Sequence, residues 1–295
     1  MGLSIAEKKI WMILDLITWG TEYLTQRSID DARLNIELML AHVIRYNRMQ
    51  LYTNFDRPLS DDELAQFKIL LKRRLTHEPL QYILGDTEFM GLKFTVDQRV
   101  LIPRADTEIL VESVIEKIKT DFVEESTVQI LEIGSGSGCI AISLAKMIPA
   151  ASIVSIDCSE DAIQLASSNA EANGVSDTIT FLNKDFLLNN DYLKKFHCIV
   201  SNPPYISNEE YVLLNAEVRE FEPKIALADG NDGLTFYHSI AHRCKENLLV
   251  NGFVAVEHAY NQSNDVQKIF AKNDWKNIKT VKDYGGNFRC VIAEL

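Results

Sequence analysis

The chain has 295 residues, of which 46% are hydrophobic, and its formal net charge is −12. This length and apolar content predict a globular protein with one large domain or two smaller ones. Lys and Arg side chains neutralise phosphates when a protein binds nucleic acid, so the acidic balance argues against a nucleic-acid partner. A local basic groove remains compatible with that balance.

The five cysteines are odd in number, and no two of them have the Cys-x-x-Cys spacing of a zinc site. We therefore expect buried, reduced thiols and no metal centre. The first residues lack the apolar run of a secretory signal, and no stretch of about 18 apolar residues predicts a membrane span. We expect a cytoplasmic monomer without membrane contact.

The beginning of the chain has the apolar periodicity of helices. The predicted helices cover residues 5–19, 30–46 and 60–76. The last of these opens with a capping box, in which Ser60 is the cap and Glu63 follows three residues later. Short helices with compact connections predict a small bundle over residues 1–84.

The pattern changes after Pro79, where glycines and alternating apolar residues replace the helical spacing. Gly85 and Gly91 punctuate a stretch that predicts a β-hairpin or an extended segment. Pro103 then precedes an amphipathic helix that continues to Ile118. We expect residues 85–105 to form a β-hairpin linker between two domains.

Residues 106–295 alternate between strand and helix patterns. The predicted strands are 128–133, 152–156, 178–182, 198–200 and 253–256, with helices at 140–147 and 162–173 and a C-terminal hairpin over 281–295. Such alternation is typical of an α/β domain with a mainly parallel sheet covered on both faces. A ligand is expected at the carboxyl ends of the strands, near the point where strand order reverses.

A glycine-rich loop, Gly134-Ser135-Gly136-Ser137-Gly138, follows the first strand of this domain and opens a helix. Asp157 lies at the end of the next strand, where a carboxylate can accept hydrogen bonds from ribose hydroxyls. Dinucleotide enzymes prefer Gly-x-Gly-x-x-Gly, whereas the spacing here is Gly-x-Gly-x-Gly. Asp185 and Phe186 follow the third strand, and Phe186 offers an aromatic face for an adenine. The combination favours S-adenosylmethionine over a dinucleotide and over a tight turn without a ligand.

The tetrapeptide Asn202-Pro203-Pro204-Tyr205 follows the fourth strand. A planar NH2 group is a poor nucleophile with two N–H donors, and it needs acceptors that hold it in place. The Asn202 side-chain oxygen and the Pro203 carbonyl are candidate acceptors, in a loop that its prolines stiffen. Tyr205 offers a flat face for stacking. The motif therefore predicts alignment of an NH2 nitrogen for methyl transfer.

These two motifs together resemble the class I methyltransferases that modify NH2 groups. Further segments, in the same order, resemble the release factor glutamine methyltransferase family. These segments are Glu78–Gly85, Leu101–Glu108, Arg219–Pro223, Glu257–His258 and Asp283–Gly285. Ala105 departs from the family pattern, which often has a second proline there, and leaves the loop less stiff.

The resemblance implies a Rossmann-like fold with a mainly parallel seven-stranded sheet, a small N-terminal helical bundle and a β-hairpin linker. It implies that S-adenosylmethionine is the methyl donor and that its contacts are Gly134, Ser135, Gly136, Ser137, Gly138, Asp157, Phe186 and Asn202. The substrate amide would be held by Asn202, Pro203, Pro204 and Tyr205. That substrate would be the glutamine of the Gly-Gly-Gln loop in class-1 release factors. The N-terminal helices would dock this partner, or they only cap the catalytic core.

Two other functions remain open. A nucleic-acid methyltransferase would flip an adenine or guanine base and stack it on Tyr205. A non-catalytic binding module would keep the fold as a scaffold and lose the motifs, whereas both motifs are intact.

Three further groups of residues allow more than one interpretation. His238 and His242 have a spacing that can bind metal, but without nearby carboxylates they predict a surface helix. Glu257 and His258 either line the site or form a polar pair at a strand end. Arg104 is expected to contact either the partner or the domain interface.

Overall fold

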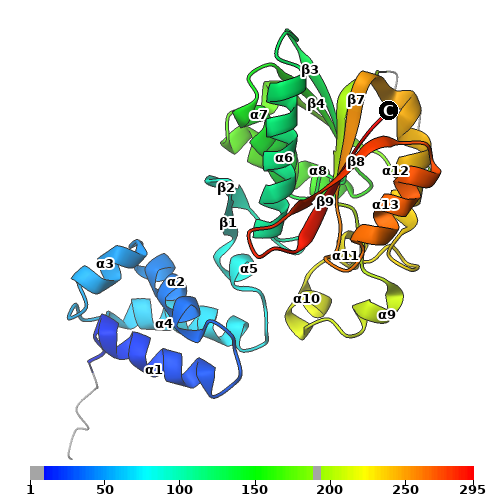
Figure 1. Cartoon of the computed structure of the whole chain (residues 1–295). Helices are drawn as coiled ribbons and strands as arrows, with labels where there is room; N and C mark the ends of the chain where they lie inside the picture. The colour runs from blue at the N-terminus through cyan, green and yellow to red at the C-terminus, as the bar shows by residue number, and fades with distance from the viewer. Residues whose placement is uncertain (1–9, 189–193) are drawn as a thin grey trace, which may run out of the picture. The chain divides into compact units, whose positions relative to one another are not determined.

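The computed structural model describes residues 10–188 and 194–295. The chain forms two compact units, of which the first ends at Leu84 and the second begins at Gly85 (Figure 1). The β-hairpin predicted as a linker belongs to the second unit, because Phe89 and Phe94 are buried in that unit's core.

The described part of the first unit contains helices joined by short loops. It contains α1 (Ile13–Thr25), α2 (Ala32–Ile44), α3 (Arg48–Thr53), α4 (Asp61–Arg74) and α5 (Leu80–Leu84). The predicted helical bundle is therefore confirmed, although residues 5–9 of its predicted first helix lie outside the described residues. The capping box is present, since the Ser60 hydroxyl accepts from the Glu63 N–H at 3.2 Å and the Glu63 carboxylate from the Ser60 N–H at 2.8 Å.

The second unit contains a two-stranded hairpin and a seven-stranded sheet. The hairpin consists of β1 (Asp86–Phe89) and β2 (Leu92–Thr95). The sheet has the order β5-β4-β3-β6-β7-β9-β8, from strands β3 (Val128–Ile133), β4 (Ala151–Asp157), β5 (Ile179–Asn183), β6 (Phe196–Ser201), β7 (Leu248–Glu257), β8 (Lys276–Lys282) and β9 (Phe288–Glu294). β9 pairs antiparallel with both β7 and β8, and the other four pairings among these strands are parallel. The predicted mainly parallel sheet of class I methyltransferases is confirmed.

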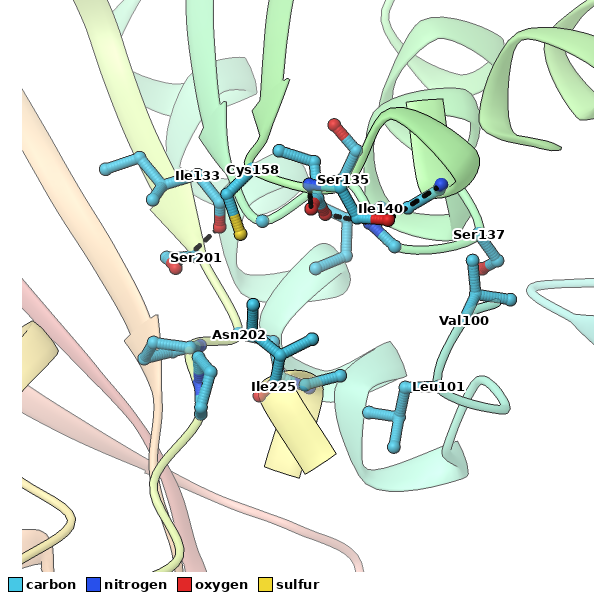
Figure 2. Close-up of a pocket in the computed structure, with 18 of the residues that line it drawn as sticks. Val100, Leu101, Ile133, Ser135, Ser137, Ile140, Cys158, Ser201, Asn202 and Ile225 are labelled. Carbon is cyan, nitrogen blue, oxygen red and sulfur yellow. Dashed lines mark hydrogen bonds between the residues drawn. The ribbon is translucent and has the colours of Figure 1, made fainter. Parts of the chain in front are cut away.

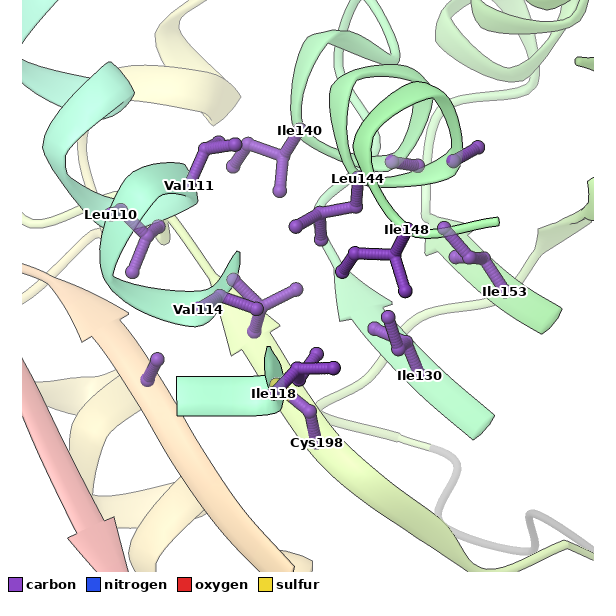
Figure 3. Close-up of a cluster of buried hydrophobic side chains, with 14 of the residues drawn as sticks. Leu110, Val111, Val114, Ile118, Ile130, Ile140, Leu144, Ile148, Ile153 and Cys198 are labelled. Atoms are coloured by element: carbon purple, nitrogen blue, oxygen red, sulfur yellow. The ribbon is translucent and has the colours of Figure 1, made fainter. Parts of the chain in front are cut away.

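Helices cover both faces of this sheet (Figure 1). The central strands have apolar side chains on each face, and both sets must be buried. One face packs against α6 (Ala105–Asp121), α7 (Cys139–Met147) and α8 (Glu160–Ala172). Figure 3 shows Val111, Val114 and Ile118 of α6 in one hydrophobic cluster with Ile140 and Leu144 of α7, and Ile118 lies beside Cys198 of β6. The other face packs against α12 (Thr235–Arg243) and α13 (Ser263–Lys272).

Several elements lie outside the predicted pattern. Short helices α9 (Asn208–Tyr211), α10 (Ala216–Phe221) and α11 (Lys224–Leu227) form an excursion between β6 and α12, and 3-10 turns cover Ser176–Thr178 and Cys244–Asn247. The predicted C-terminal hairpin is confirmed, but its first strand begins five residues earlier than expected, at Lys276 instead of 281.

The five cysteines are free thiols, as expected. The expectation that all are buried is wrong for Cys158, which is exposed because it follows the last residue of β4, where the chain leaves the sheet. Cys139, the first residue of α7, is half-buried. His238 and His242 are exposed on α12, and among the described residues no group of three or more His, Cys, Asp or Glu could hold a metal ion. Within residues 10–188 and 194–295, no helix is long and apolar enough to cross a membrane.

Candidate active site

A pocket lies at the carboxyl ends of the central strands of the sheet. β3 and β6 are adjacent and parallel there, with Ile133 opposite Ser201. The chain proceeds from β3 toward β4 and β5 on one side, and from β6 toward β7 on the other. The loops that follow β3 and β6 therefore diverge and leave room for a ligand between them.

The pocket brings together ten of the twelve residues that the sequence predicted for the site. These are Gly134, Ser135, Gly136, Ser137, Asp157, Asp185, Phe186, Asn202, Pro203 and Pro204. Figure 2 shows Ser135, Ser137 and Ile140 on the glycine-rich side, Asn202 opposite them, and Val100 and Leu101 along another wall. Gly138 and Tyr205 are not among the lining residues.

The glycine-rich loop is held against the end of β4. The N–H groups of Gly134 and Ser135 donate to the Ile156 carbonyl at 2.8 and 3.0 Å, and the Gly136 N–H donates to Asp157 Oδ2 at 2.9 Å. Gly138 serves packing instead of lining the pocket, because a Cβ there would lie 2.9 Å from Ile142 Cδ1. The loop thus presents its backbone to the pocket in a fixed position.

Two acidic loops flank this end of the sheet. The Asp157 carboxylate also accepts from the Ser159 N–H at 2.9 Å, so both of its oxygens are held at the pocket wall. Phe186 is buried, and Arg243 fixes its loop by donating to the Phe186 carbonyl at 3.0 Å and to the Leu187 carbonyl at 2.7 Å. Arg243 was absent from the predicted site, because it lies on α12, 57 residues from Phe186.

The Asn-Pro-Pro-Tyr loop presents a polarised amide. Asn202 Nδ2 donates to Thr107 Oγ1 at 3.0 Å, which leaves Asn202 Oδ1 as the acceptor atom of that side chain. The Tyr205 hydroxyl donates to Glu257 Oε1 at 3.4 Å, beneath the loop. Burial raises the pKa of Tyr205, so its hydroxyl stays protonated and acts as a donor.

Two residues from later segments fix the backbone of this loop. Gln262 Nε2 donates to the Tyr205 carbonyl at 2.9 Å. Gly233 approaches the same carbonyl so closely that a Cβ at Gly233 would lie 2.4 Å from the Tyr205 oxygen. Sequence reasoning missed both residues, although the Asp232-Gly233 pair is a turn signal.

Glu257 is the last residue of β7 and His258 follows it; both are buried, and neither lines the pocket. Burial raises the pKa of Glu257 to about 7, and the hydroxyls of Thr107 and Tyr205 and the charge of Arg289 oppose that shift. The Glu257 carbonyl accepts from the Tyr237 hydroxyl at 2.9 Å. Glu257 and His258 are therefore a polar pair at the end of a strand, and Glu257 contacts the Asn-Pro-Pro-Tyr loop through the Tyr205 hydroxyl.

Arg104 lines the pocket and forms an ion pair with Glu222, whose side chain is 1% exposed. The other Glu222 oxygen accepts from the Ile102 N–H at 3.2 Å. This buried carboxylate joins two segments that the sequence singled out separately, residues 101–108 and 219–223, and fixes one wall of the site.

Glu132 lies directly under the glycine-rich loop, is 0% exposed, and accepts a hydrogen bond from Ser155. Burial raises its pKa from 4.5 to about 8. The folded state therefore binds the carboxyl proton of Glu132 more tightly than the unfolded state does. The resulting stabilisation is complete below pH 4.5 and is lost as the pH rises through about 8.

Replacing Glu132 with glutamine removes this titration. The free energy of unfolding of E132Q, relative to the parent, is expected to rise by about 3–5 kcal/mol between pH 5 and pH 8. Urea unfolding of the ligand-free protein at both pH values measures the difference. E124Q, at an exposed position, serves as a control without such a trend. A pH-independent difference for E132Q would contradict the expected proton linkage.

Comparison with known proteins gives a family. Family models described as "PrmC N-terminal domain" and "Methyltransferase small domain" match residues 15–85 and 106–219. The chain is 41% identical to the release factor glutamine methyltransferase of Geobacter sulfurreducens over 283 residues, which cover 96% of each chain. It is 36% identical to the protein of the same name from Chlorobaculum tepidum, over 94% of this chain and 95% of that one. The chain belongs to the release factor glutamine methyltransferase family.

Membership of this family confirms the predicted resemblance and makes the chain a methyltransferase. Solved structures agree in fold. The hMettl16 catalytic domain has a TM-score of 0.54 at 17% identity, covering 81% of this chain and 84% of that one. A methyltransferase from Pyrococcus furiosus has a TM-score of 0.50 at 18% identity, covering 78% and 98%. The relatives do not favour the predicted nucleic-acid alternative.

Proposed function

We propose that this enzyme transfers a methyl group from S-adenosylmethionine to the side-chain amide nitrogen of a glutamine in the Gly-Gly-Gln loop of class-1 release factors. The observation that carries the proposal is the hydrogen bond of the Asn202 side chain, in which Nδ2 donates to Thr107 Oγ1 at 3.0 Å and leaves Oδ1 as the acceptor. An amide with its oxygen toward the pocket suits a substrate NH2 group, which offers two N–H donors and a delocalised lone pair.

The pocket residues fit the proposed cofactor. Asp157 stands where ribose hydroxyls would donate to it, and the Gly134–Gly136 backbone lets a ligand approach closely. Phe186 and Asp185 border the side proposed for adenine. When bound, S-adenosylmethionine would supply an electrophilic methyl group on its sulfonium.

The loop residues would orient the nitrogen of the substrate. Asn202 Oδ1 and the Pro203 carbonyl would each accept one N–H, so that the remaining lone pair points at the methyl carbon. A C–N bond would form as the C–S bond of the sulfonium breaks, S-adenosylhomocysteine would be the leaving group, and the nitrogen would then release one proton to solvent. This mechanism assigns alignment to the loop and needs no strong general base.

The N-terminal helical unit is proposed to dock the release factor. Support comes from the two relatives, which match 96% and 94% of this chain and carry release factors in their names. The acidic net charge of −12 suits a protein substrate better than a nucleic-acid duplex.

The direct test is methyl transfer from labelled S-adenosylmethionine to a purified class-1 release factor, read by peptide mass spectrometry. A mass increase of one methyl group is expected on the glutamine of the Gly-Gly-Gln loop. No increase is expected for a release factor in which that glutamine is alanine. DNA and RNA oligonucleotides serve as competing substrates. Transfer to an oligonucleotide but not to the release factor would overturn the proposal and favour nucleic-acid methylation.

A further inference from the structure

The first unit has a groove of about 630 Å³ between α1 and α4. Both helices pack mainly against α2, which leaves the space between them uncovered. α1 has 13 residues and α4 has 14, so each wall is about 20 Å long at a rise of about 1.5 Å per residue. The floor is apolar, because the buried side chains of Leu16, Phe67 and Leu71 line it. The groove therefore has the length of a helix of about three to four turns.

Aromatic rings form the α1 wall of this groove. Trp11 and Trp19 contact each other edge to face with ring centroids 5.5 Å apart, and Trp19 stacks on Tyr23 at 5.0 Å. The guanidinium carbon of Arg27 lies 3.6 Å from the centroid of the Tyr23 ring and ends the row. Trp19 is 37% exposed. Large aromatic side chains that a fold leaves uncovered in a groove are typical of the centre of a protein interface.

The α4 wall carries two lysines that the fold does not pair. Lys68 and Lys72 are exposed, lie one helical turn apart, and make no hydrogen bond or ion pair with the described residues. Two like charges at this spacing destabilise a helix slightly. Arg73, by contrast, pairs with Glu78 at 2.6 Å inside the unit. The unpaired positive charge of α4 therefore lies on the wall of the groove.

The charge of the groove favours an acidic occupant. Two lysines line it, against one carboxylate, that of Asp61. Residues 1–84 contain 11 Lys or Arg and 11 Asp or Glu, so residues 85–295 carry the whole net charge of −12. The groove is thus a basic and aromatic surface on a chain that is otherwise acidic. Complementarity selects a partner helix with an apolar face and carboxylates beside it.

We propose that the groove between α1 and α4 docks an acidic amphipathic helix of the protein substrate. Trp19 and Tyr23 contact the apolar face of this helix. Lys68 and Lys72 pair with its carboxylates. The enzyme then holds its substrate through a second segment, so that affinity does not depend on the methylated loop alone. The identity of the partner as a release factor rests on the proposed function.

Charge reversal on the α4 wall tests the docking site. K68E/K72E is expected to raise the KM for a purified class-1 release factor by about 10- to 100-fold, because two attractive contacts become repulsive. The kcat at saturation and the Kd for S-adenosylmethionine are expected to stay within about twofold of the parent, because the catalytic pocket is untouched. K68R/K72R keeps both charges and is expected to keep the parental KM.

Two single substitutions form a matched pair. K72E and R45E each reverse one exposed cation at the C-terminal end of a helix of the first unit, and only Lys72 lines the groove. K72E is expected to raise the KM by about three- to tenfold, and R45E by less than about twofold. A general effect of charge on the encounter would raise the KM equally in both variants.

A second measurement does not depend on methyl transfer. The chain has three tryptophans, of which Trp275 is buried in the second unit, so enzyme labelled with 5-fluorotryptophan carries an internal reference. A release factor whose loop glutamine is alanine is expected to shift the fluorine resonances of Trp11 and Trp19, assigned with W11F and W19F. The resonance of Trp275 is expected to stay in place. K68E/K72E is expected to need at least about tenfold more release factor for the same shift.

The outcomes separate the docking site from the proposed function. Unshifted Trp11 and Trp19 resonances, or equal KM values for K72E and R45E, in an enzyme that methylates the release factor would overturn the docking site alone. Shifted resonances without methyl transfer would support the docking site and overturn the proposed function.

Two other occupants are distinguished by the same labelled enzyme. Residues 1–9 include two lysines and one glutamate, a charge that the basic groove disfavours. At least about tenfold tighter binding of the release factor after their deletion would mean that this segment occupies the groove. A Trp19 resonance that shifts with enzyme concentration, together with a dimer in light scattering, would mean that a second copy occupies it. Either result would contradict the proposed occupant.

Discussion

Replacing Asn202 with alanine is expected to lower kcat for methyl transfer by about 10²- to 10³-fold, the size of effect seen when one oriented hydrogen-bonding group is lost from an active site. The substitution removes Oδ1, the acceptor proposed for the substrate NH2 group, and with it the side chain whose Nδ2 donates to Thr107. It leaves the Pro203 carbonyl and the prolines of the loop in place. The substrate nitrogen then keeps one acceptor and loses the alignment that two acceptors impose.

Comparing kcat with cofactor affinity separates a loss of substrate alignment from a loss of cofactor binding. The Kd for S-adenosylmethionine, measured by calorimetry, is expected to change less than about tenfold in N202A, because the Gly134–Gly136 backbone and Asp157 are untouched. N202D keeps an acceptor at the same place and is expected to retain more activity than N202A. A kcat for N202A within about threefold of the parent would contradict the assigned role of Asn202.

Much of the catalytic unit could be predicted from the sequence, because its central strands are fully buried. β3 was predicted with its observed bounds, since an apolar run from Val128 to Ile133 is bordered by glycine. β8 was predicted to start late, since Lys276 and Asn277 give an edge strand a polar beginning. Helices α9 to α11 were missed because four to six residues are too few to display helical periodicity.

The residues of the candidate site also fall into those that the sequence could predict and those that it could not. Residues that contact the pocket through a contiguous motif, such as Gly134 and Asn202, could be found from spacing alone. Residues that hold those motifs in place could not, because their partners lie far away in the chain. Thr107 contacts Asn202 across 95 residues, and Gln262 contacts Tyr205 across 57. Such contacts depend on the completed sheet, which brings the end of β6 beside the start of α6.

Gly233 is the position where a single methyl group is expected to have the largest structural effect. Its φ of +84° lies in the left-handed region, and a Cβ would lie 2.4 Å from the Tyr205 carbonyl oxygen and 2.8 Å from Gln262 Nε2. Gly230, three residues earlier, has a similar φ of +80° with nothing within 4 Å of a Cβ. The two glycines therefore share the backbone strain of a substitution and differ in the clash.

G230A is expected to cost about 1–2 kcal/mol in the free energy of unfolding, the strain of a left-handed alanine, and to keep its kcat. G233A is expected to cost at least about 2 kcal/mol more, or to relieve the clash by moving the Tyr205 carbonyl away from Gln262. A displacement of about 1 Å in this loop is expected to lower kcat by about 100-fold, because alignment of the substrate nitrogen is what the loop contributes. Urea unfolding and kcat, measured on both variants, separate strain from clash. Equal stability and equal kcat for the two variants would mean that the approach of Gly233 to Tyr205 does not hold the Asn-Pro-Pro-Tyr loop in place.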